Sequence, residues 1–174
     1  MKRQIQVFEY AGAILEQIGK GALLTTKSGD QVNTMTIGWG TLGIEWGKPI
    51  CTVFVRESRY TKKLLDENQE FTVNIPYGDD AKKILALCGT KSGRNTDKIK
   101  ELGLTPEPGQ TVSVPAIRQL PLTLECKVIY RQEQDPAAVN KENTDHYYPR
   151  TDVFPQGDYH TAYYGQIMAA YIIE

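Results

Sequence analysis

Short runs of β-branched and aromatic residues recur along this chain of 174 residues, and turn-forming residues separate them. Ile50–Val55 and Phe71–Ile75 have the composition of buried or half-buried strands. Leu122–Tyr130 alternates apolar with polar side chains, which predicts a long strand with one face in the core. The final segment, 160–173, predicts either a pair of strands or one long strand that bends at Gly165.

A hairpin is expected near the N-terminus, where Ala22–Thr26 leads through the turn signal Lys27–Asp30 into Gln31–Ile37. The expected helices are fewer and short: 61–68, 79–88 with Asp79 as its N-cap, and 97–102. Six or more strands with a few short helices predict a mainly β fold, an antiparallel barrel with helical additions. Neither an internal repeat nor a shift in composition marks a second domain, so residues 1–174 are expected to form one domain.

Composition narrows the classes of function. Hydrophobic residues make up 40% of the chain, charged residues 24%, and the net charge is −1. The near-neutral balance argues against a nucleic-acid binder that uses a broad basic face. No apolar run approaches the roughly 20 residues of a membrane helix, and the N-terminus lacks the apolar core of a secretion signal. We therefore expect a cytoplasmic protein without membrane or nucleic-acid partners.

The three cysteines are widely spaced and form neither a CxxC motif nor a zinc pattern. They favour a reducing compartment and predict no metal site. Cys88 has two interpretations, a reactive thiol or a buried structural one. The structural interpretation is favoured, because free cysteines commonly pack as small hydrophobes.

A candidate anion site follows the strand that ends near residue 55. Its residues offer two guanidinium groups and several hydroxyls: Arg56, Ser58, Arg59, Tyr60 and Thr61. Arginine presents a planar fork of donors that suits phosphate oxygens, and a helix starting near Thr61 would add free backbone N–H groups. The alternative is a solvated strand end. Glu57 departs from the basic pattern, and strand alternation is expected to point it away.

A Gly-rich segment with little charge, Asn33–Gly40, precedes that site by about one strand. Its glycines allow a flat ring to lie close to the backbone, although the segment could also be plain core. The residues expected to line the ring are Thr34, Met35, Thr36, Ile37 and Trp39. A ring at one end and a phosphate at the other describe flavin mononucleotide, FMN.

These segments, taken together, resemble one known family. They occur in its order along most of the chain: Gly21–Thr25, Asn33–Gly40, Trp46–Pro49, Val55–Thr61, Phe71–Pro76, Cys88–Lys98 and Gly157–His160. On them the chain resembles the flavoredoxin-like branch of the flavin reductase family, the FMN-binding split barrels. The resemblance implies a split barrel that is usually a homodimer, with FMN near the subunit interface. The long, tyrosine-containing segment 132–155 is consistent with such an interface.

The resemblance also assigns roles to residues. It implies that Arg56, Ser58, Arg59 and Thr61 hold the phosphate and ribityl end, and that the backbone of 34–37 meets the ring, with Thr36 adding a hydroxyl. Trp39 and Trp46 could flank the ring or fill the barrel mouth, and packing is favoured for Trp46. The segment after residue 87, by itself only a weak anion-loop signal, is implied to line the flavin site through Cys88, Gly89, Ser92, Arg94 and Lys98. Lys98 is the candidate cation near the flavin N1–C2 edge, where it would stabilise the reduced anion.

His160 is one of two histidines, and His146 is expected on the surface. The related reductases carry a Gly-Asp-His-type segment near the nicotinamide. This chain has Tyr159 inserted before the histidine, so that role does not transfer directly.

The sequence contains no Ser-His-Asp set or paired carboxylates. This is consistent with a flavoenzyme, because the cofactor carries the redox chemistry. We expect an FMN-dependent oxidoreductase that takes a hydride from NAD(P)H, or electrons from a redox protein. No Gly-x-Gly-x-x-Gly motif is present, so a nicotinamide would stack directly on the flavin. The alternatives are an electron-transfer flavoprotein without NAD(P)H turnover and a non-catalytic module that binds a flavin or another phosphorylated ligand.

Overall fold

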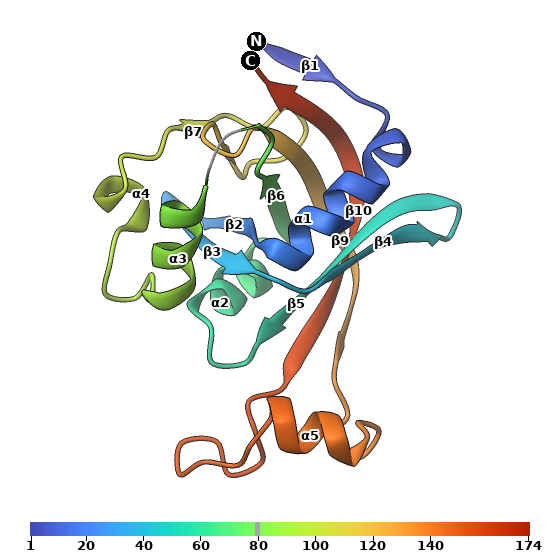
Figure 1. Cartoon of the computed structure of the whole chain (residues 1–174), viewed down its shortest axis with the longest axis vertical. Coiled ribbons are helices and arrows are strands. Elements are labelled where there is room, and N and C mark those ends of the chain that lie inside the picture. The colour runs from blue at the N-terminus through green and yellow to red at the C-terminus, as the bar shows by residue number, and fades with distance from the viewer. Residues whose placement is uncertain (79–80) are drawn as a thin grey trace.

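A computed structural model describes residues 1–78 and 81–174 and contains one large antiparallel sheet that curls around the main core (Figure 1). Its strands follow the order β3-β2-β6-β9-β10-β5-β4, and β1 pairs with β10. They are β1 (Lys2–Gln4), β2 (Ala22–Ser28), β3 (Gln31–Ile37), β4 (Gly40–Glu45), β5 (Lys48–Arg56), β6 (Glu70–Ile75), β9 (Leu122–Glu133) and β10 (His160–Ile173). A separate short ladder joins β7 (Pro106–Glu107) to β8 (Ala116–Ile117). The mainly β prediction is confirmed.

The helices lie outside the sheet (Figure 1). They are the 3-10 turn η1 (Val7–Tyr10), α1 (Ala11–Lys20), α2 (Tyr60–Glu67), α3 (Lys82–Thr90), α4 (Lys98–Glu101) and α5 (Lys141–Tyr147). The predicted helices at 61–68 and 97–102 are confirmed within one residue at each end, and Asp97 caps α4 by accepting from the N–H of Lys100. The predicted cap at Asp79 falls outside the described residues. In the part of the chain that the structure describes, no helix is long and apolar enough to cross a membrane.

The last strand, β10, is a single long strand, so the second alternative for 160–173 is correct. It pairs with β9 on one edge and with β5 on the other. The register shifts between Tyr164 and Gly165. A Cβ at Gly165 would lie 2.4 Å from the ring of Phe71 and 2.8 Å from the Cβ of Cys126. The absence of a side chain there lets β10 cross the core closely.

The sequence interpretation missed two helices. In α1, the buried side chains of Ile14 and Ile18 recur at helical spacing and pack against the main core. The second, α5, lies in the segment that was expected to be a loop. Residues 134–159 leave β9 and return to β10, and they form a lobe at the far end of these two strands (Figure 1). We refer to residues 134–159 as the lobe.

The proline-containing loop 105–115 covers the outer face of the sheet. Hydrogen bonds to one buried carboxylate attach it there. Glu125 of β9 is fully buried. It accepts hydrogen bonds of 2.6 to 2.7 Å from the hydroxyl of Tyr171, from the N–H groups of Gln110 and Thr111, and from the Thr111 hydroxyl. Burial acts to raise the pKa of Glu125, but these hydrogen bonds outweigh it and leave the pKa below its ordinary value.

Replacing Glu125 by Gln should therefore destabilise the fold. We expect a loss of about 1.5–3 kcal/mol at pH 7, the size of one hydrogen bond to a charged group. The depressed pKa stabilises the protein above the unfolded carboxyl's pKa, and this stability is lost as the pH falls through the folded value. The difference between wild type and variant, measured by urea unfolding, should shrink on acidification. Glu133→Gln, an exposed change on the same strand, is the control; equal losses in both variants would contradict this role.

Candidate flavin site

A hollow of about 290 Å³ lies between the turn from β5 to α2, the middle and C-terminal part of the edge strand β3, and the end of α3 with the loop that follows it. We call it the cationic hollow. The residues that line it are Asn33, Met35, Thr36, Ser58, Arg59, Tyr60, Thr61, Cys88, Gly89, Lys91, Ser92, Gly93, Arg94 and Lys98. Eleven of these fourteen were predicted as site residues. The structure therefore brings together segments that lie up to 65 residues apart, from Asn33 to Lys98.

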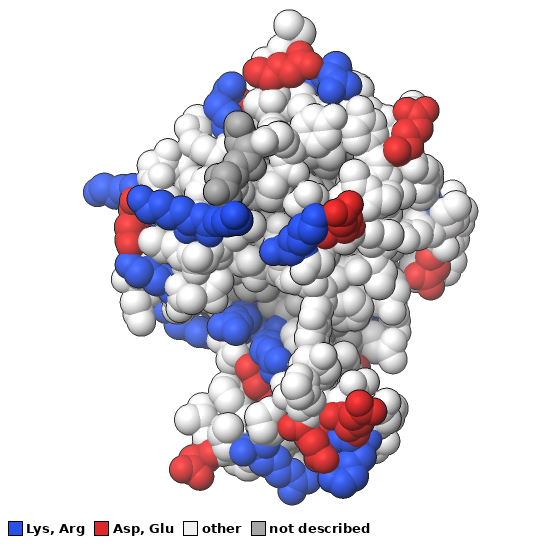
Figure 2. Space-filling view, viewed as in Figure 1, with Lys and Arg blue, Asp and Glu red and all other residues white. Residues whose placement is uncertain are grey.

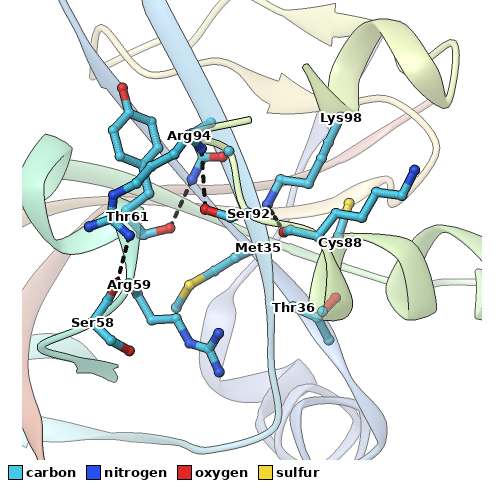
Figure 3. A pocket seen from close by; sticks show the side chains of 14 residues that line it. Met35, Thr36, Ser58, Arg59, Thr61, Cys88, Ser92, Arg94 and Lys98 are labelled. Atoms are coloured by element: carbon cyan, nitrogen blue, oxygen red, sulfur yellow. Dashed lines mark hydrogen bonds between the residues drawn. The ribbon is translucent and has the colours of Figure 1, made fainter. Parts of the chain in front are cut away.

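Among the described residues, four cationic side chains line this hollow and no lining residue carries a carboxylate. Figure 2 shows several Lys and Arg side chains on this face of the barrel, above the lobe. Lys91 forms an ion pair with Glu101, and Arg94 donates to the carbonyl of Ser58 at 2.9 Å. Arg59 differs: among residues 1–78 and 81–174, none accepts a hydrogen bond from its guanidinium. In Figure 3 no dashed line joins Arg59 to the other residues drawn. The hollow thus holds positive charge that an anion would neutralise.

Lys98 is buried in this hollow, with 4% of its surface exposed, and its Nζ donates to the carbonyl of Lys91 at 3.3 Å. Burial lowers the pKa of Lys98, and the charge of Arg59 acts in the same direction, against the influence of Cys88. Burial likewise raises the pKa of the Cys88 thiol, which Lys98 partly opposes. The raised pKa favours the structural interpretation of Cys88, because a thiol is nucleophilic as the thiolate.

The hydroxyl groups of the predicted anion site are partly committed to internal bonds. The carboxylate of Asp158 accepts from both the N–H (3.0 Å) and the hydroxyl (2.6 Å) of Ser58. Thr61 accepts from the side-chain amide of Asn33 at 2.9 Å, which ties α2 to β3. Ser58 therefore anchors the lobe, and Arg59, Lys98 and the start of α2 are the donors that face the hollow.

A second hollow of about 170 Å³ adjoins the first, and the two share Met35, Thr36 and Arg59. We call it the aromatic hollow. Its other lining residues are Ile37, Gly38, Trp39, Phe54, Arg56 and His160. The two hollows together form a trough that is cationic at one end and aromatic at the other.

The backbone of β3 runs along this trough. Strand β3 stands at the end of the sheet order, so only one of its edges pairs with another strand. Thr36 donates to the carbonyl of Leu85 in α3 at 2.6 Å. Thr34 is the exception among the predicted ring contacts: its side chain is fully buried and bonds with Leu24 and Thr25. Any contact of Thr34 with a ligand would have to be made by its backbone.

Arg56 lines the aromatic hollow together with Arg59, but it does not line the cationic hollow, where Ser58, Tyr60 and Thr61 lie. Its guanidinium donates to the carbonyls of Asp158 (2.7 Å) and Tyr147 (3.0 Å), and it lies over the ring of Tyr148. Sequence reasoning placed Arg56 and Arg59 in one phosphate site. The structure instead uses Arg56 to hold the lobe and leaves Arg59 available.

His160 closes the aromatic hollow. Its Nδ1 lies 2.9 Å from the hydroxyl of Tyr148, and its ring lies 5.1 Å from that of Trp39. Burial lowers the pKa of His160 to about 4, and the charges of Arg56 and Arg59 contribute, while Asp158 opposes them. The imidazole is therefore neutral near pH 7.

Several residues outside the predicted set also line the trough, namely Asn33, Lys91 and Gly93 at the cationic end and Gly38, Phe54 and His160 at the other. Phe54 could have been found from strand alternation, because it stands two residues before Arg56 on β5. Glu57 points away as expected, accepting from Thr161 and pairing with Lys62. Trp46 lies in neither hollow; it is 59% exposed and packs edge-on against Tyr130.

Comparison with known proteins agrees with this arrangement. Residues 19–174 match the model of the "Flavin reductase like domain" family. This chain belongs to that family. Flavoredoxin of Desulfovibrio vulgaris (Miyazaki F) is 27% identical, with a TM-score of 0.68 over 88% of this chain and 69% of that one. An FMN-binding domain of a flavin reductase-like enzyme from Shewanella baltica shares the split-barrel fold, with a TM-score of 0.67 at 13% identity over 99% and 77% of the two chains.

Among curated proteins, an uncharacterized protein of Archaeoglobus fulgidus is 32% identical over 60% of this chain, and one of Pyrococcus abyssi is 29% identical over 61%. The matches span 58% and 59% of the length of those two relatives. Membership of the flavin reductase family thus accounts for the fold.

The neutral state of His160 gives a first test of the site. In a His146→Gln variant the remaining imidazole, followed by NMR, should titrate near pH 4. Because this value lies below the ordinary 6.5, the unfolded chain binds the proton first, so His160 should reduce the free energy of unfolding as the pH falls from 6.5 to 4. A titration midpoint near 6.5 would mean that the lobe does not cover His160 in solution.

Proposed function

We propose that this protein binds FMN in the trough and acts as an oxidoreductase of the flavin reductase or flavoredoxin type. The observation that carries the proposal is the cationic hollow, where buried Lys98 and exposed Arg59 face each other and no described lining residue carries a carboxylate. The buried positive charge of Lys98 is costly unless it is compensated, and a phosphate placed there would offset its repulsion with Arg59. The combined trough also reaches the size of small-molecule sites, roughly 300–1,000 Å³.

The residues present fit the remaining parts of FMN. The isoalloxazine ring would lie along Met35–Ile37, where the free edge of β3 offers backbone donors and acceptors. Trp39 and Phe54 provide apolar surface at the same end, and Ser92 and Thr36 provide hydroxyls beside the cationic end. When bound, the flavin would supply the hydride and electron transfer. The protein's part is to position the ring and to set its electrostatic surroundings.

The electron donor is proposed to be NAD(P)H or a redox protein. A specific observation favours a second candidate, electron transfer without NAD(P)H turnover: flavoredoxin is among the solved structures most similar to this chain, at 27% identity. A structure similar at 16% identity is described as an NADH:FAD oxidoreductase of Streptomyces globisporus. We place the protein in the cytoplasm, because Cys51, Cys88 and Cys126 are all free thiols.

We also propose a homodimer. The extended strands carry exposed apolar side chains: Ile44 is 71% exposed, Trp46 59%, Tyr130 43% and Met168 40%. Exposed aromatic residues and methionine are enriched in the cores of interfaces. Burying them against a second copy would stabilise the association through the hydrophobic effect.

A spectrum and a reductant titration separate these possibilities. The purified protein should be yellow, or become so with FMN, and anaerobic NADH or NADPH should bleach the visible flavin bands. Bound flavin that only a chemical reductant or a reduced redox protein bleaches would select the electron-transfer candidate. Bound flavin without turnover by any reductant would leave a binding module. No heat and no fluorescence quenching on FMN titration would refute the proposal.

Arg59→Ala should weaken FMN binding and affect riboflavin much less, because Arg59 addresses the phosphate. We expect a loss of about 1.5–3 kcal/mol for FMN, typical of a hydrogen bond to a charged group. Isothermal titration with both ligands measures the difference. Lys63→Ala is the matched control, since Lys63 is an exposed cation on α2 outside the trough. Equal losses for FMN and riboflavin would show that Arg59 acts through the fold.

Lys98→Ala should lower the reduction potential of bound FMN, because a nearby positive charge stabilises the reduced anion. The expected change is on the order of 1 kcal/mol, measured by spectroelectrochemistry on protein shown to retain FMN. Lys91→Ala provides the comparison, since Lys91 is exposed and already paired with Glu101. An unchanged or higher potential in the Lys98 variant would place the ammonium away from the ring and make Arg94 the better candidate.

A further inference from the structure

A third hollow of about 400 Å³ continues the trough beyond Trp39, between α1 and the start of β4. We call it the apolar groove. It shares Gly38, Trp39 and Phe54 with the aromatic hollow. The remaining lining residues are Leu15, Ile18, Gly19, Gly40 and Gln134. None of the eight carries a charge, in contrast to the cationic hollow at the opposite end of the row.

Two large apolar side chains in the groove are open to solvent. Leu15 of α1 is 42% exposed, and Trp39 is 41% exposed. Exposed apolar surface next to a candidate cofactor site is a recurrent mark of ligand binding. The position of Trp39 matters most, because it lines both the groove and the aromatic hollow.

Among the described lining residues, Gln134 alone has a side-chain amide. Its Oε1 accepts from the N–H of His160 at 3.1 Å, which orients the amide. Within the described part of the chain, Nε2 donates to no residue. The groove therefore combines apolar and aromatic surface with one oriented pair of N–H donors.

We propose that the apolar groove binds an uncharged, planar carbonyl compound of the quinone class, which serves as electron acceptor. Its ring would pack against Trp39 and Phe54, and one carbonyl would accept from Gln134 Nε2. An anionic nucleotide is disfavoured here, because the groove has no cation to compensate for lost hydration. The inference rests on the proposed function, which places the flavin ring in the adjoining hollow.

The proposed oxidoreductase function would supply the electrons that reduction of a quinone requires. Reduction of a quinone to its hydroquinone takes two electrons and two protons. A bound flavin in its two-electron-reduced anionic form would supply both electrons and one proton, solvent would supply the second proton, and the flavin would return to its oxidised form. The groove contributes position and exclusion of water.

Binding can be measured without flavin, by the fluorescence of Trp39. In a Trp46→Phe variant Trp39 is the sole tryptophan, and menadione should quench its fluorescence in a saturable way. The sulfonated analogue, 1,4-naphthoquinone-2-sulfonate, should bind at least ~10-fold more weakly, because its charge would enter an apolar site. In the Trp39→Phe variant, quenching of Trp46 should be linear and collisional. Linear quenching of Trp39 as well would overturn the proposal.

Two substitutions on α1, each adding one negative charge, provide a matched test and control. Leu15→Glu should weaken menadione by ~10-fold or more by introducing a charge into the apolar wall, whereas Ala13→Glu, an exposed position outside the groove, should leave it unchanged. Gln134→Glu keeps the acceptor for His160 but removes the donors, and it should also weaken binding. Equal affinity in the two helix variants would overturn the proposal.

Light scattering and flavin titration of the same variants separate the remaining outcomes. If Leu15→Glu converts a dimer to a monomer and menadione no longer competes, the groove is a contact between copies and the proposal fails. Flavin binding without saturable menadione binding refutes this inference alone. Menadione binding without flavin binding refutes the proposed function and leaves the groove as a quinone site.

Discussion

The hydrogen bonding of β10 along both of its edges is the constraint on which the rest of the structure depends. His160 pairs with Arg56 at one end, and Ile172 pairs with Leu122 at the other. A slip of one residue would turn the buried ring of Tyr163 to the opposite face. Because this register is fixed, the lobe must return to the barrel beside the β5–α2 turn. The topology therefore places the lobe next to the candidate flavin site.

Charged side chains are well compensated by hydrogen bonds in the scaffold, but not in the candidate site. In the scaffold, the buried carboxylate of Glu125 accepts four hydrogen bonds, and Asp158 accepts two from Ser58. In the cationic hollow, the ammonium of Lys98 has one long bond to a carbonyl, and Arg59 repels it. Natural proteins tolerate such locally unfavourable arrangements mainly at functional sites. The uncompensated charge therefore supports the proposed binding of an anion in this hollow.

Three adjoining hollows form a series in polarity, from cationic to aromatic to apolar. Adjacent hollows share side chains, Met35 and Arg59 at the first boundary and Trp39 and Phe54 at the second. A ligand with a charged end and a flat ring can lie in the first two only in one orientation. The gradient in polarity therefore sets the orientation of such a ligand. The order of these residues in the sequence does not reveal it.

The sequence by itself determined the β architecture and most of the cationic hollow. Strand composition, alternation and turn signals are local, so the hairpin β2–β3, the strands β5, β6 and β9, and the helix α2 could be predicted from short windows. Helix α1 could not be placed as easily, because Gly12 and Gly19 lower its intrinsic propensity and tertiary packing stabilises it.

Only the tertiary structure decided what each cation does. Arg56 and Arg59 stand three residues apart and have the same chemistry, yet Arg56 binds carbonyls that lie 91 and 102 residues away, while Arg59 faces the open hollow. Ser58 likewise meets a carboxylate 100 residues away. Such partners come from strand register and lobe position, which no local pattern encodes. The sequence was enough to predict which side chains could donate hydrogen bonds at the site. Contacts with residues far away in the chain determine which of these donors remain available to a ligand.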